Sequence, residues 1–242
     1  MANVNLETEI KGLGKVFYCV DSFDISCKAV LEKCDSIISM RDLAYAFMAD
    51  AEYCGSWKSS SLCTNKSYVR EGALVTPKQT ILLSESLILK NPSAALAAHS
   101  NYLGARTFSE YYLPDLNVEE LLHQIGKDNY CIASERSIPT ACFEDYDETR
   151  WAFKDQAKNF GLFLKDCGVS SVMILSPRFR SNSFENPYSY SSAHQFTFYL
   201  FEHSGPFFNP INEGSSFHID SWSSLKTLAP LRVRGIYEHE DV

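Results

Sequence analysis

The sequence lacks the features that mark a membrane-spanning, secreted or strongly basic protein. No stretch approaches the ~18 apolar residues that a membrane span needs. The first residues, MANVNLETEIKG, contain no basic segment followed by an apolar one, so they do not resemble a secretory signal. The 22 Lys and Arg residues are outnumbered by 30 Asp and Glu residues, which gives a net charge of −8. We therefore expect a cytoplasmic protein with no membrane partner. We do not expect nucleic acid as its main partner, because such binding depends on cations that neutralise phosphates.

Close cysteine pairs are also absent, although the chain has 8 cysteines. No CxxC occurs, whereas structural zinc sites usually take their ligands in such pairs. Several cysteines stand among apolar residues, as Cys19 does in VFYCV. Without a secretory signal, this pattern favours reduced, buried thiols over disulfides or a metal centre. No pattern in the sequence indicates a cofactor.

Sequence motifs for catalysis are missing as well. There is no GxSxG nucleophile elbow, and KGLGK (11–15) matches neither the phosphate-binding GxxxxGK[ST] nor the dinucleotide-binding GxGxxG. A cysteine and a histidine that meet only in the folded protein would leave no such motif. The sequence therefore leaves open whether the protein is an enzyme.

The composition that remains is typical of a folded domain. Hydrophobic residues make up 45% of the 242 residues and charged residues 21%, which is enough apolar material for a large core. We expect a single domain over residues 1–242, with a soft boundary near 104–116. Helix patterns come first, and strand patterns fill the last third. The predicted fold class is α+β, with N-terminal helices and short strands followed by a mostly antiparallel sheet covered on both faces by helices.

One early helix has clear boundaries. Ser39 followed by Asp42 has the form of a capping box, and the apolar residues after it recur at helical spacing. Gly55 supplies a stop, because glycine readily adopts the left-handed conformation that ends helices. These signals predict a helix over 40–53.

A second helix is predicted over 148–167, with Asp147 as its cap and Gly168 after its end. Its apolar residues step by four and three positions, so they form a single stripe on one side of the helix, made of Phe153, Ala157, Phe160, Leu164 and Cys167. We interpret Cys167 as part of the core rather than as a nucleophile.

Strand patterns occur at 15–20, 68–75, 80–89, 130–134, 172–175, 196–201, 216–222 and 231–237. The runs VMIL (172–175) and FTFYLF (196–201) are apolar on both faces, which is typical of strands covered on both sides. We interpret these two runs as the strands of one hairpin. A hairpin loop normally has two to five residues, whereas this one would have the 17 residues of 177–193.

The long loop has the composition of a recognition surface. Its sequence, PRFRSNSFENPYSYSSA, combines serines and asparagines, which adapt their hydrogen bonds, with aromatic residues that offer rigid contact area. Arg178 and Arg180 could hold a carboxylate or phosphate, and Tyr188 and Tyr190 could contact the rest of a ligand. The alternative is a surface excursion whose aromatic residues pack back onto the sheet.

One tripeptide offers acid–base chemistry. His218 and Asp220 are two positions apart in a predicted strand, so they share one face, with Trp222 beside them. The pair could act as a general acid and base, and we add Trp222 to the candidate ligand-binding residues. The alternative is an ordinary solvated strand face.

Three classes of function remain. The favoured one is a ligand- or protein-binding regulatory domain that uses 177–193, with a protein or a small anionic ligand as its partner. The second is a small hydrolase or transferase that uses His218 and Asp220. The third is a structural or assembly subunit, since aromatic residues are frequent at protein interfaces. The sequence indicates no oligomeric state.

Overall fold

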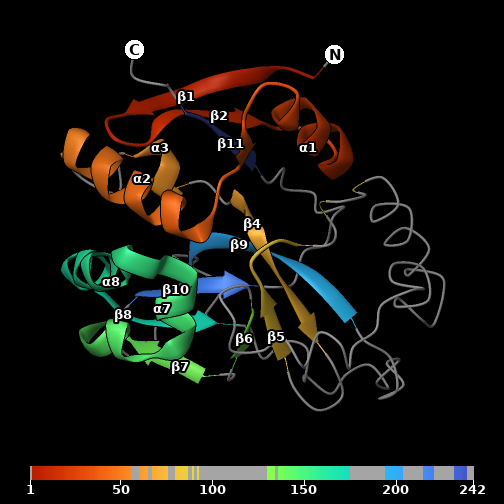
Figure 1. The fold of residues 1–242 in the computed structure, drawn as a ribbon. Coiled ribbons are helices and arrows are strands. Elements are labelled where there is room, and N and C mark those ends of the chain that lie inside the picture. The colour runs from red at the N-terminus through yellow and green to blue at the C-terminus, as the bar shows by residue number, and fades with distance from the viewer. Residues whose placement is uncertain are drawn as a thin grey trace.

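The computed structural model describes residues 2–55, 60–64, 67–75, 80–86, 89, 92, 130–133, 136–174, 194–203, 215–220 and 232–238. These residues form a mixture of helices and strands, so the coarse α+β class is confirmed (Figure 1). The expected boundary at 104–116, the loop 177–193 and Trp222 lie outside the described residues. The helical segments are α1 (Phe23–Leu31), α2 (Met40–Tyr53), α3 (Ser61–Thr64), η3 (Thr140–Asp145), α7 (Asp147–Phe153), η4 (Lys154–Gln156) and α8 (Ala157–Asp166).

The described strands belong to one sheet. Its main path runs β1–β2–β11–β4–β9–β10–β8–β7, with β3 beside β11, β5 beside β4, and β6 beside β5. The described pairs are antiparallel except β10 with β8 and β11 with β4, so a mostly antiparallel sheet is confirmed. The strands are β1 (Val4–Ile10), β2 (Gly14–Cys19), β3 (Ser36–Ile37), β4 (Ser67–Val75), β5 (Thr80–Leu83), β6 (Tyr130–Ala133), β7 (Arg136–Pro139), β8 (Val169–Ile174), β9 (His194–His203), β10 (Ser215–Asp220) and β11 (Arg232–Tyr237).

The expected hairpin between the two apolar runs is wrong. Strand β10 lies between β8 and β9 and pairs with both of them, parallel to the first and antiparallel to the second. The two runs are therefore not neighbours in the sheet. The sequence could not show this, because β10 is supplied by residues that come later in the chain.

Seven strands begin or end toward one side of the sheet, which we call the loop rim. Their ends are not level, because Ile174 is aligned with Leu200, whereas His194 lies six residues further along β9. The pairing register places Val75, Thr80 and Ala133 at this rim on one side, and Arg136, Ile174, His194 and Asp220 on the other. Only residues 134–135 separate β6 from β7, so the Cα atoms of Ala133 and Arg136 lie at most ~11 Å apart. Because β6 and β7 are the two ends of a seven-strand path, the sheet must curl at this rim.

Helix α1 packs against β2 and β11, and α2 packs against β1 and β4 (Figure 1). Cys19 and Val233 face α1, whereas Val16 and Ile236, at alternate positions of the same strands, join the core with α2. Gly235 permits the close approach of α1, because a Cβ atom there would lie 2.4 Å from Val30 Cγ1. The wider expectation, that helices cover both faces of the whole sheet, stays a prediction.

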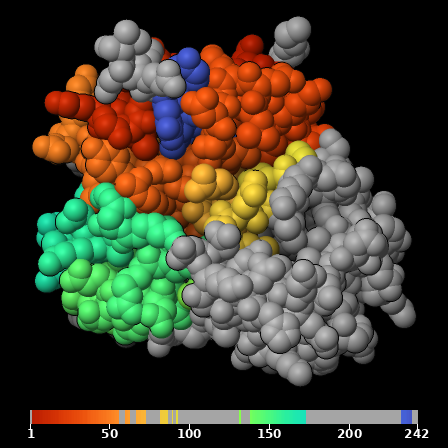
Figure 2. All heavy atoms as spheres, viewed as in Figure 1, coloured from red at the N-terminus to blue at the C-terminus, as the bar shows by residue number. Residues whose placement is uncertain are grey.

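The helix over 40–53 is confirmed as α2. Ser39 Oγ accepts a hydrogen bond from the backbone N–H of Asp42 at 3.1 Å, as expected for an N-cap. Gly55 follows the helix with φ of 68°. In the space-filling view the orange residues of α2 lie directly against the green residues of α7 and α8 (Figure 2).

The helix expected over 148–167 is broken, which corrects the sequence interpretation. Its stripe still faces the core, where the rings of Phe153 and Phe160 lie 5.0 Å apart. The helix stops at Phe153, however, and resumes at Ala157 after the short η4 turn. Lys154 at the break has φ 51° and ψ −126°, a conformation that glycine adopts easily and residues with a Cβ avoid. The stripe spacing could not reveal this break, because the apolar pattern continues across it.

We predict that Lys154→Gly stabilises the protein relative to Lys154→Ala. Both variants lose the contact between Lys154 Nζ and the Trp151 ring, 5.5 Å from its centroid, so the alanine variant is the matched control. Relief of the strained backbone should raise the free energy of unfolding by about 1–3 kcal/mol. The greater conformational freedom of glycine in the unfolded state should lower it by about 0.5–1 kcal/mol. Chemical denaturation should therefore give the glycine variant the higher free energy of unfolding, and equal values would contradict the strain at this position.

Candidate functional site

The residues singled out in the sequence fall in two groups. Arg178, Arg180, Tyr188, Tyr190 and Trp222 lie outside the described residues. The backbones of His218 and Asp220 belong to β10, opposite Phe201 and Tyr199 of β9. Asp220 is at the loop rim, and His218 is two residues away from it. Their strand therefore leads to the same rim at which β8 ends with Ile174.

A β-bulge in β4 builds a junction that the sequence did not indicate. Tyr68 pairs with Tyr199 and Gly72 with Thr197, so three residues of β4 stand opposite Phe198 alone. The backbone groups freed by this bulge find other partners. The N–H of Arg70 donates to the Ile38 carbonyl at 2.9 Å, and its carbonyl accepts from the Ser86 N–H at 2.7 Å. The bulge thus joins β4 to the segments before α2 and after β5.

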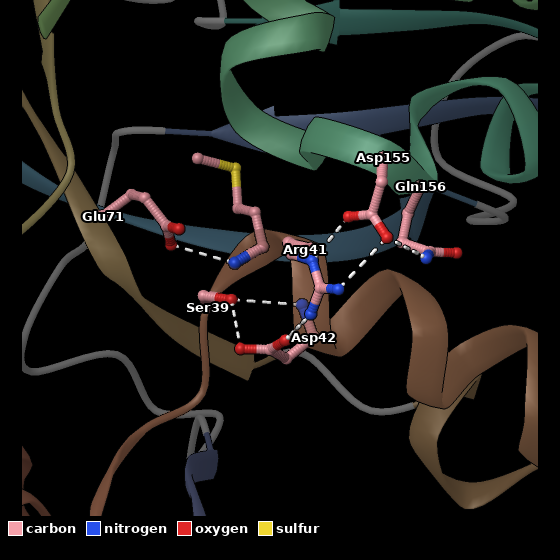
Figure 3. Close-up of polar contacts among 7 residues, drawn as sticks. Ser39, Arg41, Asp42, Glu71, Asp155 and Gln156 are labelled. Atoms are coloured by element: carbon pink, nitrogen blue, oxygen red, sulfur yellow. Dashed lines mark hydrogen bonds and ion pairs between the residues drawn. The ribbon is translucent and has the colours of Figure 1, made fainter. Parts of the chain in front are cut away.

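Glu71 completes this junction with its side chain (Figure 3). Its Oε2 accepts a hydrogen bond from the backbone N–H of Met40 at 2.9 Å. Met40 is the first residue of α2, where backbone N–H groups have no partner within the helix. Glu71 is only 6% exposed, so its carboxyl group meets the helix end out of reach of bulk water.

Burial raises the pKa of Glu71 to about 7, although the hydrogen bond from Met40 and the charge of Arg70 act in the opposite direction. The nearby charge of Asp42 adds to the increase. The carboxyl group therefore changes its protonation state close to neutral pH. Such a group can take up or release a proton under ordinary conditions, which most carboxyl groups in proteins cannot do.

A second set of contacts fixes α2 to the break between α7 and α8 (Figure 3). Arg41 binds Asp155 through two bonds, Nε to Oδ1 at 2.6 Å and Nη2 to Oδ2 at 3.1 Å. Its Nη1 also donates to Asp42 Oδ1 at 2.8 Å. The Arg41 bond holds the pKa of the Asp155 carboxyl below its usual range. Both partners are partly exposed, so the pair contributes about 1 kcal/mol or less to stability.

A buried ionic cluster connects the first and last strands. A bulge between Leu6 and Thr8 of β1 turns Glu7 inward, where its side chain is 2% exposed. Glu7 contacts the guanidinium groups of Arg232 and Arg234, with Arg234 Nε 2.5 Å from Oε2. Ser61 Oγ of α3 also donates to Glu7 at 2.9 Å.

The charge of Glu7 is stabilised where it lies. Burial alone would raise its pKa, but the hydrogen bond and charge of Arg234, together with Arg232 and Ser61, outweigh burial and lower the pKa. Alternation along the strand pattern 231–237 places Arg232 and Arg234 on one side, and both contact Glu7. The sequence did not indicate Glu7 itself, because a glutamate in an alternating strand pattern normally faces water.

The described part of the chain offers no metal centre. Among these residues, no three or more His, Cys, Asp and Glu side chains are grouped so that they could hold a metal ion. The described cysteines are free, and burial raises the pKa of the Cys34 and Cys131 thiols to about 11. Those thiols would be poor nucleophiles, because the thiolate is the reactive form. Of the helices that the structure describes, none has the length and apolar character to cross a membrane.

Comparison with known proteins adds little to this geometry. No protein-family model matches the chain, and no curated protein matches it. One solved structure that resembles it comes from work on how the C-type lectin fold accommodates massive sequence variation in Nanoarchaeota. The two sequences are 14% identical, the match covers 95% of this chain and 99% of the other, and the TM-score is 0.47. A likeness at this level carries no weight for function.

We predict that Glu7→Gln lowers the free energy of unfolding at pH 7 by about 3–5 kcal/mol, because it leaves buried arginine charge uncompensated. The pH dependence has a definite sign. Since the pKa of Glu7 is lowered in the folded protein, its contribution is present above the unfolded pKa of 4.5 and is lost as the pH falls through the folded pKa. Denaturation of the wild-type protein should therefore show a steeper loss of stability in acid than denaturation of the variant.

The matched control for this prediction is Glu9→Gln on the same strand. Glu9 is exposed and its carboxylate lies 4.0 Å from Lys15 Nζ, so its loss should change stability by less than about 0.5 kcal/mol. Equal effects of the two substitutions would show that the buried cluster does not stabilise the fold.

Proposed function

We propose that this protein is a ligand- or protein-binding regulatory domain whose recognition segment is 177–193. Its partner is a protein or a small ligand with an anionic group. The observation that carries this proposal is the excess length of the chain between Ile174 and His194.

The gap that this chain has to cross is short. Ile174 and Leu200 both lie opposite Ile219, so two strand spacings, or about 10 Å, separate them across the sheet. His194 is six residues before Leu200 along β9, which adds about 20 Å in the strand direction. An extended chain of about seven residues would cover the combined distance. The segment has 19 residues, so about twelve are not needed to make the connection.

Excess chain at a rim of strand ends is a common basis for recognition. A rigid sheet holds both ends of such a segment, while its sequence can vary without loss of the core. The residues of 177–193 suit this role, since they combine tyrosines with serines and asparagines. Arg178 and Arg180 supply the two cations that an anionic group would need. Asp220 ends β10 at the same rim, and Trp222 follows it by two residues in the sequence, which is why we include Trp222 among the proposed ligand contacts.

We predict that an Arg178→Ala/Arg180→Ala variant loses at least tenfold in affinity for an anionic probe. A hydrogen bond to a charged group contributes about 1.5–3 kcal/mol, and about 1.4 kcal/mol corresponds to a factor of ten. Inorganic phosphate and a short acidic peptide are the probes, and binding is followed by native mass spectrometry and by the thermal unfolding midpoint. A probe at 100 times its Kd should stabilise the wild-type protein by about 2.7 kcal/mol.

The control is Lys158→Ala/Lys165→Ala, which removes the same amount of charge from exposed positions of α8. Its affinity should stay within twofold of the wild type. Equal binding by the arginine variant and the wild type would reject the segment as the recognition site. Loss of a catalysed reaction in His218→Ala, with probe binding intact, would instead favour the hydrolase or transferase. A stable oligomer that binds neither probe would favour the assembly subunit.

A further inference from the structure

We propose that Glu71 is a proton-operated latch that closes the junction between the β4 bulge and the start of α2 when its carboxyl group is protonated, and loosens that junction when the proton is lost. The proposal goes beyond the recognition segment and does not depend on it. It rests on the position of one buried carboxyl group and on the backbone bonds around it.

Two glutamates of this protein, Glu7 and Glu71, are turned inward by β-bulges, so the surroundings of the two carboxyl groups can be compared directly. Glu7 lies against two guanidinium groups, and its negative charge is compensated there. Glu71 lies against a backbone N–H, and no ion pair to it occurs among the described residues. A carboxylate buried without an ion pair is strongly disfavoured relative to the neutral acid. The two sites therefore favour opposite protonation states of the same side chain.

The charged groups around Glu71 do not supply the missing pair. Arg70, its neighbour on β4, is half-buried and lowers the pKa of Glu71, but this effect is smaller than that of burial. On α2, Arg41 is already bound by Asp42 and by Asp155 of η4 (Figure 3). The charge of Asp42 itself opposes a second negative charge nearby. Glu85, after β5, is exposed to solvent.

The pH dependence of the latch has a definite sign. The pKa of Glu71 is raised to about 7 in the folded protein, against 4.5 for the unperturbed group. Its stabilising contribution is therefore fully present below pH 4.5 and is lost as the pH rises through 7. The Met40 bond on its own favours the carboxylate, but the cost of burying the charge is larger. On loss of the proton the junction therefore opens as a whole, with the Met40 bond to Glu71 and the Arg70 bonds to Ile38 and Ser86.

The bulge that carries Glu71 also lies beside the first residues of β9. Gly72 through Val75 pair with Thr197 through His194, directly after the bulge that carries Glu71. Loosening of the bulge should therefore weaken the pairing between β4 and the first residues of β9, the strand that begins at the loop rim. Opening of this kind is local, since the bonds that open include none within α8.

Amide hydrogen exchange on the full-length protein tests the latch, with the N–H groups of Met40, Arg70 and Ser86 as reporters. After correction for the intrinsic effect of hydroxide on exchange, their opening should increase about tenfold between pH 6 and pH 8. The N–H of Cys167, which donates to Phe163 in α8, is the reference and should stay within twofold. An equal increase at Cys167 would mean global unfolding and would overturn a local latch.

Two variants sharpen the test. Glu71→Gln keeps an acceptor for Met40 but does not titrate, so its reporters should show no pH-dependent opening. Glu85→Gln, at an exposed position beside Ser86, should keep the tenfold change. If Glu71→Gln does not fold, the carboxyl carbon of Glu71 is titrated by NMR in the wild-type protein. A midpoint near 7 supports the latch, and a midpoint near 4.5, or reporters that do not respond to pH, overturns it.

Discussion

The contact between the Glu7 carboxylate and the Arg234 guanidinium lies inside the protein, and the arrangement around it depends on that contact. It joins the first strand to the last across β2, and Ser61 brings α3 to the same point. Once β11 is held in this way, Gly235 lets α1 pack on one face while Ile236 faces the core with α2 on the other. Loss of either partner would destabilise the protein strongly, because the remaining charge would be buried where water cannot compensate it.

A second buried glutamate, Glu71, makes the junction between the β4 bulge and α2 less stable than the Glu7 cluster. Glu71 closes the β4 bulge onto α2 without a cation to balance its charge, so its protonation affects how firmly the junction is held. The bulge stands between a well-packed region of α2, α7 and α8 and the strands that lead to the loop rim. This arrangement is compatible with the recognition role that we propose for 177–193, because segments that bind partners are commonly attached to the less stable parts of a fold.

Local signals predicted part of the fold well. The start of α2 could be located from Ser39 and Asp42 and its end from Gly55, because capping and left-handed stops depend on neighbouring residues only. Prediction was weaker where distant residues decide the outcome. The apolar stripe from Phe153 to Cys167 has helical spacing throughout, yet Lys154 breaks the helix. The proposed hairpin was wrong because β10, from later in the chain, lies between its two strands.

The sequence by itself determined the mixture of helices and strands, the position of α2, and the shared side of Arg232 and Arg234 on their strand. These features follow from spacing and from the conformational preferences of single residues. Only the tertiary structure decided strand order, the curl of the sheet, and the burial of Glu7 and Glu71. Each of those requires a β-bulge or a pairing between residues far apart in the chain, and strand alternation alone would have turned Glu7 toward water.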